Sequence, residues 1–225
     1  MLKFVYKSKN AVVVYKPENI PSAPDKTGTP DLMSLCKKAL IEMGESGELY
    51  LVHRLDTVVA GILVFARNKE SSRQLSALVA DGMVNKEYFA VTCGTATEGT
   101  LADYLCKNPK INKAFVSNSS QNGAKYAELS YKTLGISSTE KGERSLVKIK
   151  LKTGRFHQIR AQFSSRGLPL VGDTKYGSRD FGRRTPALFA YRLDFELMGE
   201  HIIAEDLPDL TAYPWNLFQC ENYKG

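Results

Sequence analysis

Residues 53–66 have the sequence His-Arg-Leu-Asp-Thr-Val-Val-Ala-Gly-Ile-Leu-Val-Phe-Ala, in which a charged segment leads through a glycine into an apolar run. The run of residues 62–66 is short and follows Gly61, which predicts a buried β-strand. Asp56 lies just before this strand, where a carboxylate can act as a nucleophile, act as a base or cap a turn. Arg54 lies on the same side of an extended segment and favours the ionised form of Asp56.

A second polar segment, residues 153–160, has the sequence Thr-Gly-Arg-Phe-His-Gln-Ile-Arg. Gly154 permits a tight turn, and the helix expected up to Gly167 presents backbone N–H groups at its start, where anions bind favourably. The polar face of this helix consists of His157, Arg160 and Ser164. Ile159 and Phe163 lie on another face and are expected to pack inward. The same pattern suits an exposed amphipathic helix with solvated arginines, so the segment alone leaves both interpretations open.

Residues 87–93 alternate between two faces, which predicts a strand. Tyr88 lies on the face opposite Phe89 and has Lys86 as a nearby cation. A tyrosine in this position is either a residue at the edge of the core, satisfied by one hydrogen bond, or a ring that stacks on a base.

The remaining segments mix strands and helices without regular alternation. Further strands are expected at residues 3–6, 11–15, 126–134, 145–151 and 187–195. Further helices are expected over residues 69–80 and up to Gly44, the latter capped by Thr29 with Pro30 in its first position. Residues 95–125, rich in Gly, Asn, Ser and Lys, are expected to form a mobile surface insertion. The pattern predicts an α+β fold in which residues 1–225 form a single domain, with a largely antiparallel mixed sheet flanked by helices.

Composition narrows the class of function. The net charge of +7 and pI of about 9.1 are typical of proteins that neutralise phosphates, although many other proteins share them. The four cysteines and three histidines are scattered, so we expect neither a metal site nor a disulfide. No apolar stretch reaches about 18 residues and no signal peptide is evident, so we expect a cytoplasmic protein without a membrane partner. The sequence leaves the oligomeric state open, and a monomer is expected.

Together these segments resemble the RluA-type pseudouridine synthases over nearly the whole chain. Residues 53–56, His-Arg-Leu-Asp, match the signature of that family. Four further stretches match in order: the opening strand with its lysine-proline turn at 12–21, the lysine-x-tyrosine strand at 86–91, the motif at 153–160 and the segment at 169–177. Five ordered matches over this length are highly specific. The resemblance implies the pseudouridine synthase fold.

The sequence departs from the family pattern in two respects. The family usually has threonine, serine and glycine where this chain has Val59, Ala60 and Gly61, so two hydroxyls that could hold the catalytic loop are missing. Many relatives carry an accessory N-terminal RNA-binding domain, whereas the synthase core is expected to begin here near residue 3. RNA selection is then expected to come from the core, its insertions or a partner.

The resemblance implies an RNA pseudouridine synthase, which isomerises specific uridines in ribosomal or transfer RNA. It implies that the target base is flipped out of the stacked helix and that no metal or cofactor is needed. The catalytic residues it implies are Asp56 as the catalytic aspartate, Tyr88 stacked on the uracil, and Arg160 paired with Asp56. The RNA contacts it implies come from Arg54, Lys86, Arg155 and His157. Because loss of one partner of a buried ion pair costs about 3–5 kcal/mol, Arg160→Ala is expected to harm folding as well as turnover.

Two other functions remain open. A non-catalytic RNA-binding or RNA-chaperone protein on the same fold would fit the missing hydroxyls at positions 59 and 60. A hydrolase of glycosidic bonds usually needs a second carboxylate, which these motifs do not supply. An enzyme should keep RNA binding and lose turnover in Asp56→Asn, whereas a chaperone should keep its function.

Overall fold

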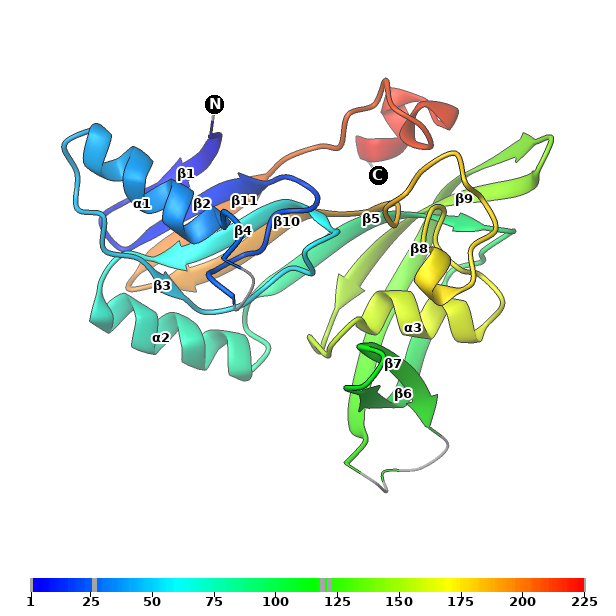
Figure 1. Ribbon diagram of the computed structural model, residues 1–225, viewed down its shortest axis with the longest axis horizontal. Coiled ribbons are helices and arrows are strands. Elements are labelled where there is room, and N and C mark those ends of the chain that lie inside the picture. The colour runs from blue at the N-terminus through cyan, green and yellow to red at the C-terminus, as the bar shows by residue number, and fades with distance from the viewer. Residues whose placement is uncertain (1, 26–27, 118–119, 121–122, 225) are drawn as a thin grey trace. The chain divides into compact units, whose positions relative to one another are not determined.

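The computed structural model describes residues 2–25, 28–117, 120 and 123–224 (Figure 1). The chain divides into two compact units, one of residues 1–86 with 190–208 and one of residues 87–189 with 209–225. Strands β5 (Asn85–Cys93) and β10 (Leu188–Leu197) each pass from one unit into the other. The single domain expected from the sequence stays a prediction.

The first unit is built on a sheet with the strand order β1–β2–β4–β10, in which β3 pairs with β4 and β11 pairs with β10. The other strands are β1 (Phe4–Lys7), β2 (Ala11–Lys16), β3 (Tyr50–Leu51), β4 (Ala60–Ala66) and β11 (Glu200–Glu205). The pairings of β1 with β2, β2 with β4, β3 with β4 and β10 with β11 are antiparallel. The strands expected at 3–6, 11–15 and 62–66 are confirmed, whereas β3 and β11 were not predicted.

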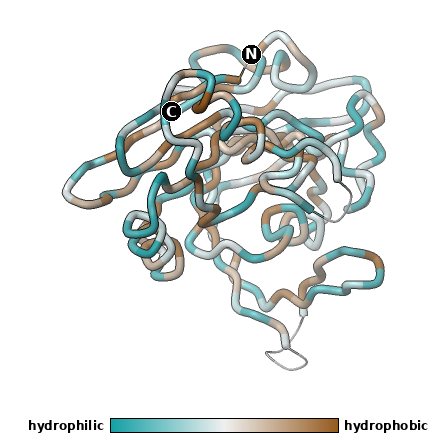
Figure 2. Tube along the Cα trace, turned by 60° about the vertical axis from the view of Figure 1, so that its left-hand side comes forward, coloured by the Kyte–Doolittle hydropathy of each residue, from teal (hydrophilic) through white to brown (hydrophobic). Residues whose placement is uncertain are grey.

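Helix α2 (Lys69–Ala80) covers one face of this sheet. Its range agrees with the prediction because Asn68 and Ser71 form a capping box, in which each side chain accepts the backbone N–H of the other. Leu75, Leu78 and Val79 of the helix pack on side chains of β2, β4, β10 and β11. Figure 2 shows hydrophobic and hydrophilic residues alternating in short stretches along the chain.

Helix α1 spans Leu32–Glu42 and begins later than expected. Its N-cap is Asp31, whose carboxylate accepts the N–H of Ser34 at 2.9 Å. The prediction of Thr29 as the cap, with Pro30 in the first helical position, is therefore wrong. None of the helices in the described part of the chain is long and apolar enough to cross a membrane.

The second unit has the strand order β5–β9–β8–β6–β7. Its strands, besides β5, are β6 (Gly99–Asn108), β7 (Lys113–Ser117), β8 (Lys125–Thr139) and β9 (Gly142–Leu151). β6 pairs antiparallel with both β7 and β8, and β8 pairs antiparallel with β9. Helix α3 (Gln158–Ser165) packs on β6 and β7, and three short 3₁₀ helices follow at Thr174–Tyr176, Trp215–Leu217 and Cys220–Lys224. The expected α+β class is confirmed.

Residues 95–125 were expected to form a surface insertion and no strand was predicted there, but β6 and β7 lie in this range. The strands are amphipathic: Leu101, Leu105 and Ala114 are buried, while polar residues dominate the other positions. So few apolar residues give a weak alternation signal, and the strands depend on long-range pairing. The mobility expected of the segment stays a prediction, and its residues 118–119 and 121–122 lie outside the described residues.

Candidate active site

Asp56 lies in the loop that joins β3 to β4 in the first unit. The loop is anchored by Leu55, which is buried and whose backbone makes two hydrogen bonds with Ser22: the Leu55 N–H donates to Ser22 Oγ at 3.2 Å and its carbonyl accepts the Ser22 hydroxyl at 3.1 Å. Asp56 is half-buried and Arg54 is exposed. With Leu55 fixed in the core, the two charged neighbours on either side of it are directed away from the core.

Lys16, which the sequence analysis placed only in the lysine-proline turn, holds the other side of this loop. Its side chain is fully buried, and its ammonium donates to the carbonyls of Pro17, Ile20 and Thr57 at 2.9, 2.8 and 3.0 Å. Burial lowers the pKa of Lys16 to about 8, an effect that the negative charge of Asp56 partly opposes. One cation therefore ties the turn after β2 to the residue that follows Asp56.

His53 fixes the start of the same loop. The backbone N–H of Val64 donates to His53 Nε2 at 3.4 Å, which places the ring against β4. Burial, together with the positive charge of Lys86, lowers the pKa of His53 to about 3. At neutral pH the ring is uncharged, accepts at Nε2 and carries its proton on Nδ1. His53 thus has a structural role in the loop.

Lys86, at the start of β5, is 9% exposed, and burial lowers its pKa. Its charge acts on His53, so the two residues are neighbours in the first unit. The phosphate contact assigned to Lys86 from the sequence stays a prediction.

In the second unit, Gln158 organises the turn before α3. Its side-chain oxygen accepts the Thr153 hydroxyl at 2.8 Å and the Arg155 N–H at 2.9 Å, and its amide donates to the Glu128 carbonyl at 3.1 Å. The left-handed backbone of this turn belongs to His157, at φ 52°, and not to Gly154. The side chain of Gln158 therefore holds the segment before the helix, whereas α3 itself has no side-chain cap.

Arg160 forms a buried bidentate ion pair with Asp173, which sequence analysis did not identify as a partner. Arg160 Nε and Nη2 donate to the two carboxylate oxygens at 2.7 and 2.8 Å, and the residues are 4% and 1% exposed. The guanidinium also lies 4.9 Å from the centre of the Tyr176 ring. These contacts fix the plane of the guanidinium.

The predicted polar face of α3 meets a single residue, Tyr176. Arg160 lies over its ring, His157 Nδ1 is 2.9 Å from its hydroxyl, and the Ser164 hydroxyl donates to its carbonyl at 2.6 Å. The Tyr176 hydroxyl also accepts the N–H of Ala114 in β7 at 2.8 Å. The grouping of these three polar side chains is therefore confirmed, while Ile159 and Phe163 are buried as expected.

His157 is uncharged in this environment. Burial lowers its pKa to about 3, and the positive charges of Arg160 and Lys175 act in the same direction. The ring that forms the hydrogen bond with the Tyr176 hydroxyl is therefore a neutral imidazole. A neutral donor can form a hydrogen bond with RNA but cannot neutralise a phosphate.

The other predicted site residues of the second unit differ in exposure. Tyr88 in β5 is 7% exposed, as expected for a ring at the edge of the core. Arg155 is exposed, and its Nε donates to the carbonyl of Tyr126 at 2.9 Å. In the part of the chain that the structure describes, no group of three or more His, Cys, Asp or Glu side chains could hold a metal ion.

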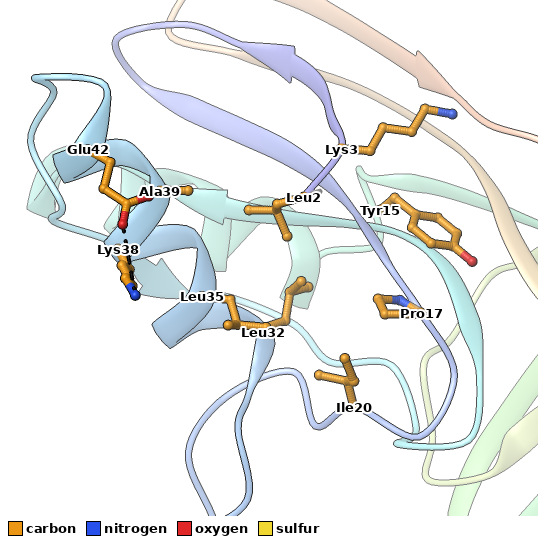
Figure 3. Close-up of a pocket in the computed structure, with 10 residues that line it drawn as sticks. All are labelled: Leu2, Lys3, Tyr15, Pro17, Ile20, Leu32, Leu35, Lys38, Ala39 and Glu42. Atoms are coloured by element: carbon orange, nitrogen blue, oxygen red, sulfur yellow. Dashed lines mark ion pairs between the residues drawn. The ribbon is translucent and has the colours of Figure 1, made fainter.

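A groove of about 520 Å³ lies beside α1 in the first unit. Its lining is largely apolar and includes Leu32, Leu35, Ile20 and Pro17 (Figure 3). None of the residues assigned to catalysis or RNA binding lines it. The groove is therefore separate from the set of candidate site residues.

Comparison with known proteins agrees with the motifs. The family described as RNA pseudouridylate synthase matches residues 10–165. The chain is 30% identical to ribosomal large subunit pseudouridine synthase D of Borreliella burgdorferi, over 87% of this chain and 61% of that protein. It is 31% identical to tRNA pseudouridine synthase C of Haemophilus ducreyi, over 81% of this chain and 77% of that protein.

The fold agrees as well. The structure of human RNA Pseudouridylate Synthase Domain Containing 1 superposes with a TM-score of 0.80 and 22% sequence identity, covering 96% of this chain and 86% of that one. This similarity confirms the expected pseudouridine synthase fold. The family match covers residues 10–165, which is most of the chain. The chain therefore belongs to the RNA pseudouridylate synthase family.

Proposed function

We propose that this protein is an RNA pseudouridine synthase that isomerises specific uridines in ribosomal or transfer RNA, with Asp56 as its catalytic carboxylate. The observation that carries the proposal is the construction of the Asp56 loop, which is held by Ser22 on one side and by Lys16 on the other. A half-buried carboxylate on a loop fixed at both ends is preorganised for chemistry on a bound base. Family membership supplies the reaction class, and the relatives named for this activity act on both kinds of RNA.

The reaction breaks the bond between uracil N1 and ribose C1′, rotates the base and forms a bond from C5 to C1′. The C5 proton is released to solvent and N1 gains a proton, so that atoms and electrons balance without a redox partner. Asp56 can serve as a nucleophile on the sugar, a nucleophile on the base or the acceptor of a ribose proton. All three roles need the ionised carboxylate, which the nearby Lys16 ammonium favours.

We infer that Arg160 pairs with Asp56 and aims it at the substrate. A guanidinium carries five N–H donors. The Asp173 carboxylate engages two of its nitrogens, Nε and Nη2, and so orients the group. A pair of this kind would keep Asp56 ionised. Tyr88 is proposed to stack on the target uracil and to assist proton transfer at the ring.

The target base has to leave the stacked helix, at a cost of a few kcal/mol. Arg54, exposed and adjacent to the fixed Leu55, is proposed to fill the vacated space. Lys86 and Arg155 are proposed to contact phosphates. His157, being neutral, is proposed to contact the RNA by a hydrogen bond rather than to pair with a phosphate.

The missing hydroxyls at Val59 and Ala60 do not argue against activity. Both residues are buried, at 2% and 5% exposure, and the Val59 N–H donates to the Asp56 carbonyl at 3.0 Å. The turn after Asp56 is thus closed by backbone and packing, so side-chain hydroxyls are not needed to close it.

Tritium release tests the proposal directly, with bulk RNA labelled at uridine C5 as substrate. The native protein is expected to release tritium, and Asp56→Asn is expected to release none while it binds RNA with native affinity. A native protein that binds RNA and releases no tritium would instead be the non-catalytic RNA-binding protein.

A further inference from the structure

Three aromatic rings lie exposed on neighbouring strands of the second unit. Tyr104 of β6, Phe115 of β7 and Tyr126 of β8 are 37%, 42% and 42% exposed. These three residues are called the aromatic ladder below. Single exposed apolar residues are common on protein surfaces, but adjacent ones that form a patch indicate an interaction surface.

The strand register places the three rings on one face. Tyr104 is directly opposite Tyr126, and Cys106, two residues further along β6, is directly opposite Phe115. Residues that are directly opposite, or two apart on one strand, point to the same side of a sheet. The rings of Tyr104 and Tyr126 lie 5.9 Å apart at an interplanar angle of 69°. The ladder therefore runs across β7, β6 and β8.

Helix α3 covers the opposite face of the same strands. Leu105, Ala114 and Ala127 are buried there and pack with Ala161 and Tyr176. The core of the unit is therefore complete without the ladder. Packing in the core therefore does not explain why the three rings are placed on the outer face.

Two contacts hold β7 and β6 in place, one with Tyr176 and one with Phe156 before α3. The Ala114 N–H donates to the Tyr176 hydroxyl, and Lys107 Nζ lies 4.2 Å from the centre of the Phe156 ring. Phe156 in turn stacks on His157 with 3.8 Å between ring centres. The ladder is thus presented on a strand held rigidly beside the start of α3.

Cations surround the ladder. Lys113 Nζ lies 5.4 Å from the centre of the Phe115 ring, Arg155 is hydrogen-bonded to the Tyr126 carbonyl, and Lys110 is exposed in the turn between β6 and β7. The Tyr126 hydroxyl donates to the Glu128 carboxylate at 2.6 Å, and that carboxylate is also paired with Lys152 at 3.1 Å. The cations around the ladder are therefore complementary to a polyanion, and its aromatic rings can stack on planar groups such as bases.

We propose that the aromatic ladder is a stacking platform for unpaired bases of the RNA substrate, with Lys110, Lys113 and Arg155 placed for the phosphates. Bases stack on aromatic side chains irrespective of sequence, because every base has a π-face. The platform would hold a single-stranded segment of the RNA away from the target uridine. The identification of the ligand as substrate RNA rests on the proposed function, whereas the binding of single-stranded RNA does not.

The test compares two fluorescently labelled probes of equal length, a short oligouridine and an abasic RNA with the same sugar-phosphate backbone. Phe115→Leu and Tyr104→Leu are each expected to weaken oligouridine binding about fivefold or more, and to leave abasic RNA binding unchanged. Phe115→Trp should bind oligouridine at least as tightly as the native protein. The matched control is Ile203→Ala, which alters a 48% exposed strand residue of the first unit and should affect neither probe.

Several outcomes would overturn the platform: native oligouridine affinity in both leucine variants, equal losses for the two probes, or weaker binding by Phe115→Trp. The tryptophan variant keeps the test valid if a leucine variant unfolds, since it retains a large ring. Tritium release measured on the same samples separates the two proposals. If oligouridine binding depends on the ladder but the native protein releases no tritium, only the synthase activity is contradicted. If the native protein releases tritium but oligouridine binding does not depend on the ladder, only the platform is contradicted.

Discussion

Lys16 shows at the scale of one residue how a buried cation organises the loop of Asp56. Burial lowers its pKa from 10.5 to about 8, so between these pH values the unfolded chain binds more protons than the folded one. The free energy of unfolding should therefore rise with pH over this window, by on the order of 3 kcal/mol. Urea denaturation should show the rise in the native protein and not in Lys16→Met. The control is Lys38→Met, which removes a lysine whose side chain is 77% exposed and should keep the rise. If the free energy of unfolding depends on pH in the same way in both variants, Lys16 is not the group that causes the rise.

Arg160 and Arg166 provide a second comparison, because both lie in or next to α3 and both pair with an aspartate. The Arg160–Asp173 pair is buried, whereas the side chain of Arg166, paired with Asp103, is 36% exposed. Removing one partner of a buried pair leaves an uncompensated charge and costs about 3–5 kcal/mol, while an exposed pair contributes about 0–1 kcal/mol. We expect Arg160→Ala to lower the free energy of unfolding and abolish turnover, and Arg166→Ala to change both little. Similar urea midpoints for the two variants would refute this account.

At the scale of the element, Gly61 determines how closely β4 can approach β10. A Cβ at this position would lie 2.3 Å from the Ala190 carbonyl oxygen, and the backbone φ is +126°. Gly61→Ala therefore combines backbone strain with a clash against main chain and should cost about 3 kcal/mol or more. Gly44→Ala is the matched control, since its φ is +75° but nothing lies within 4 Å, and it should cost about 1–2 kcal/mol. If the two variants lose the same free energy of unfolding in thermal or urea denaturation, backbone strain and not the close approach to β10 accounts for the cost.

Elements with a strong local signal could be predicted from the sequence, and those that depend on distant partners could not. The run at β4 and the capped helix α2 were predicted because their hydrophobic pattern and termini are encoded within a few residues. β6 and β7 were missed because one face of each strand is polar or carries exposed aromatic rings, and the cause of their pairing lies in β8 and α3. The start of α1 was misplaced because Thr29 and Asp31 are both good caps, and only the hydrogen bond to Ser34 decides between them.

For the whole molecule, the motifs located the candidate site residues but not the contacts that hold them. Asp56 and the polar face of α3 were identified from residue type and spacing alone. The bond from Lys16 to Thr57 joins residues 41 positions apart, and the partner of Arg160 is one aspartate among many in the chain. Such contacts have no local pattern, since folding alone determines which carbonyl or carboxylate meets a given cation.

The net charge of +7 predicts that RNA affinity falls steeply with salt, and the ion pairs indicate which cations contribute. Arg73 is paired with Glu70 at 2.8 Å, whereas exposed Arg54 and Lys110 have no acidic partner among the residues that the structure describes. A cation that contacts a single-stranded phosphate contributes about −0.7 to the slope of log affinity against log salt. Arg54→Gln and Lys110→Gln should each make the slope less steep by about that amount, whereas Arg73→Gln, with the same change in net charge, should not. If all three variants shift the slope equally, RNA responds to the total charge of the protein, and specific phosphate contacts by Arg54 and Lys110 are excluded.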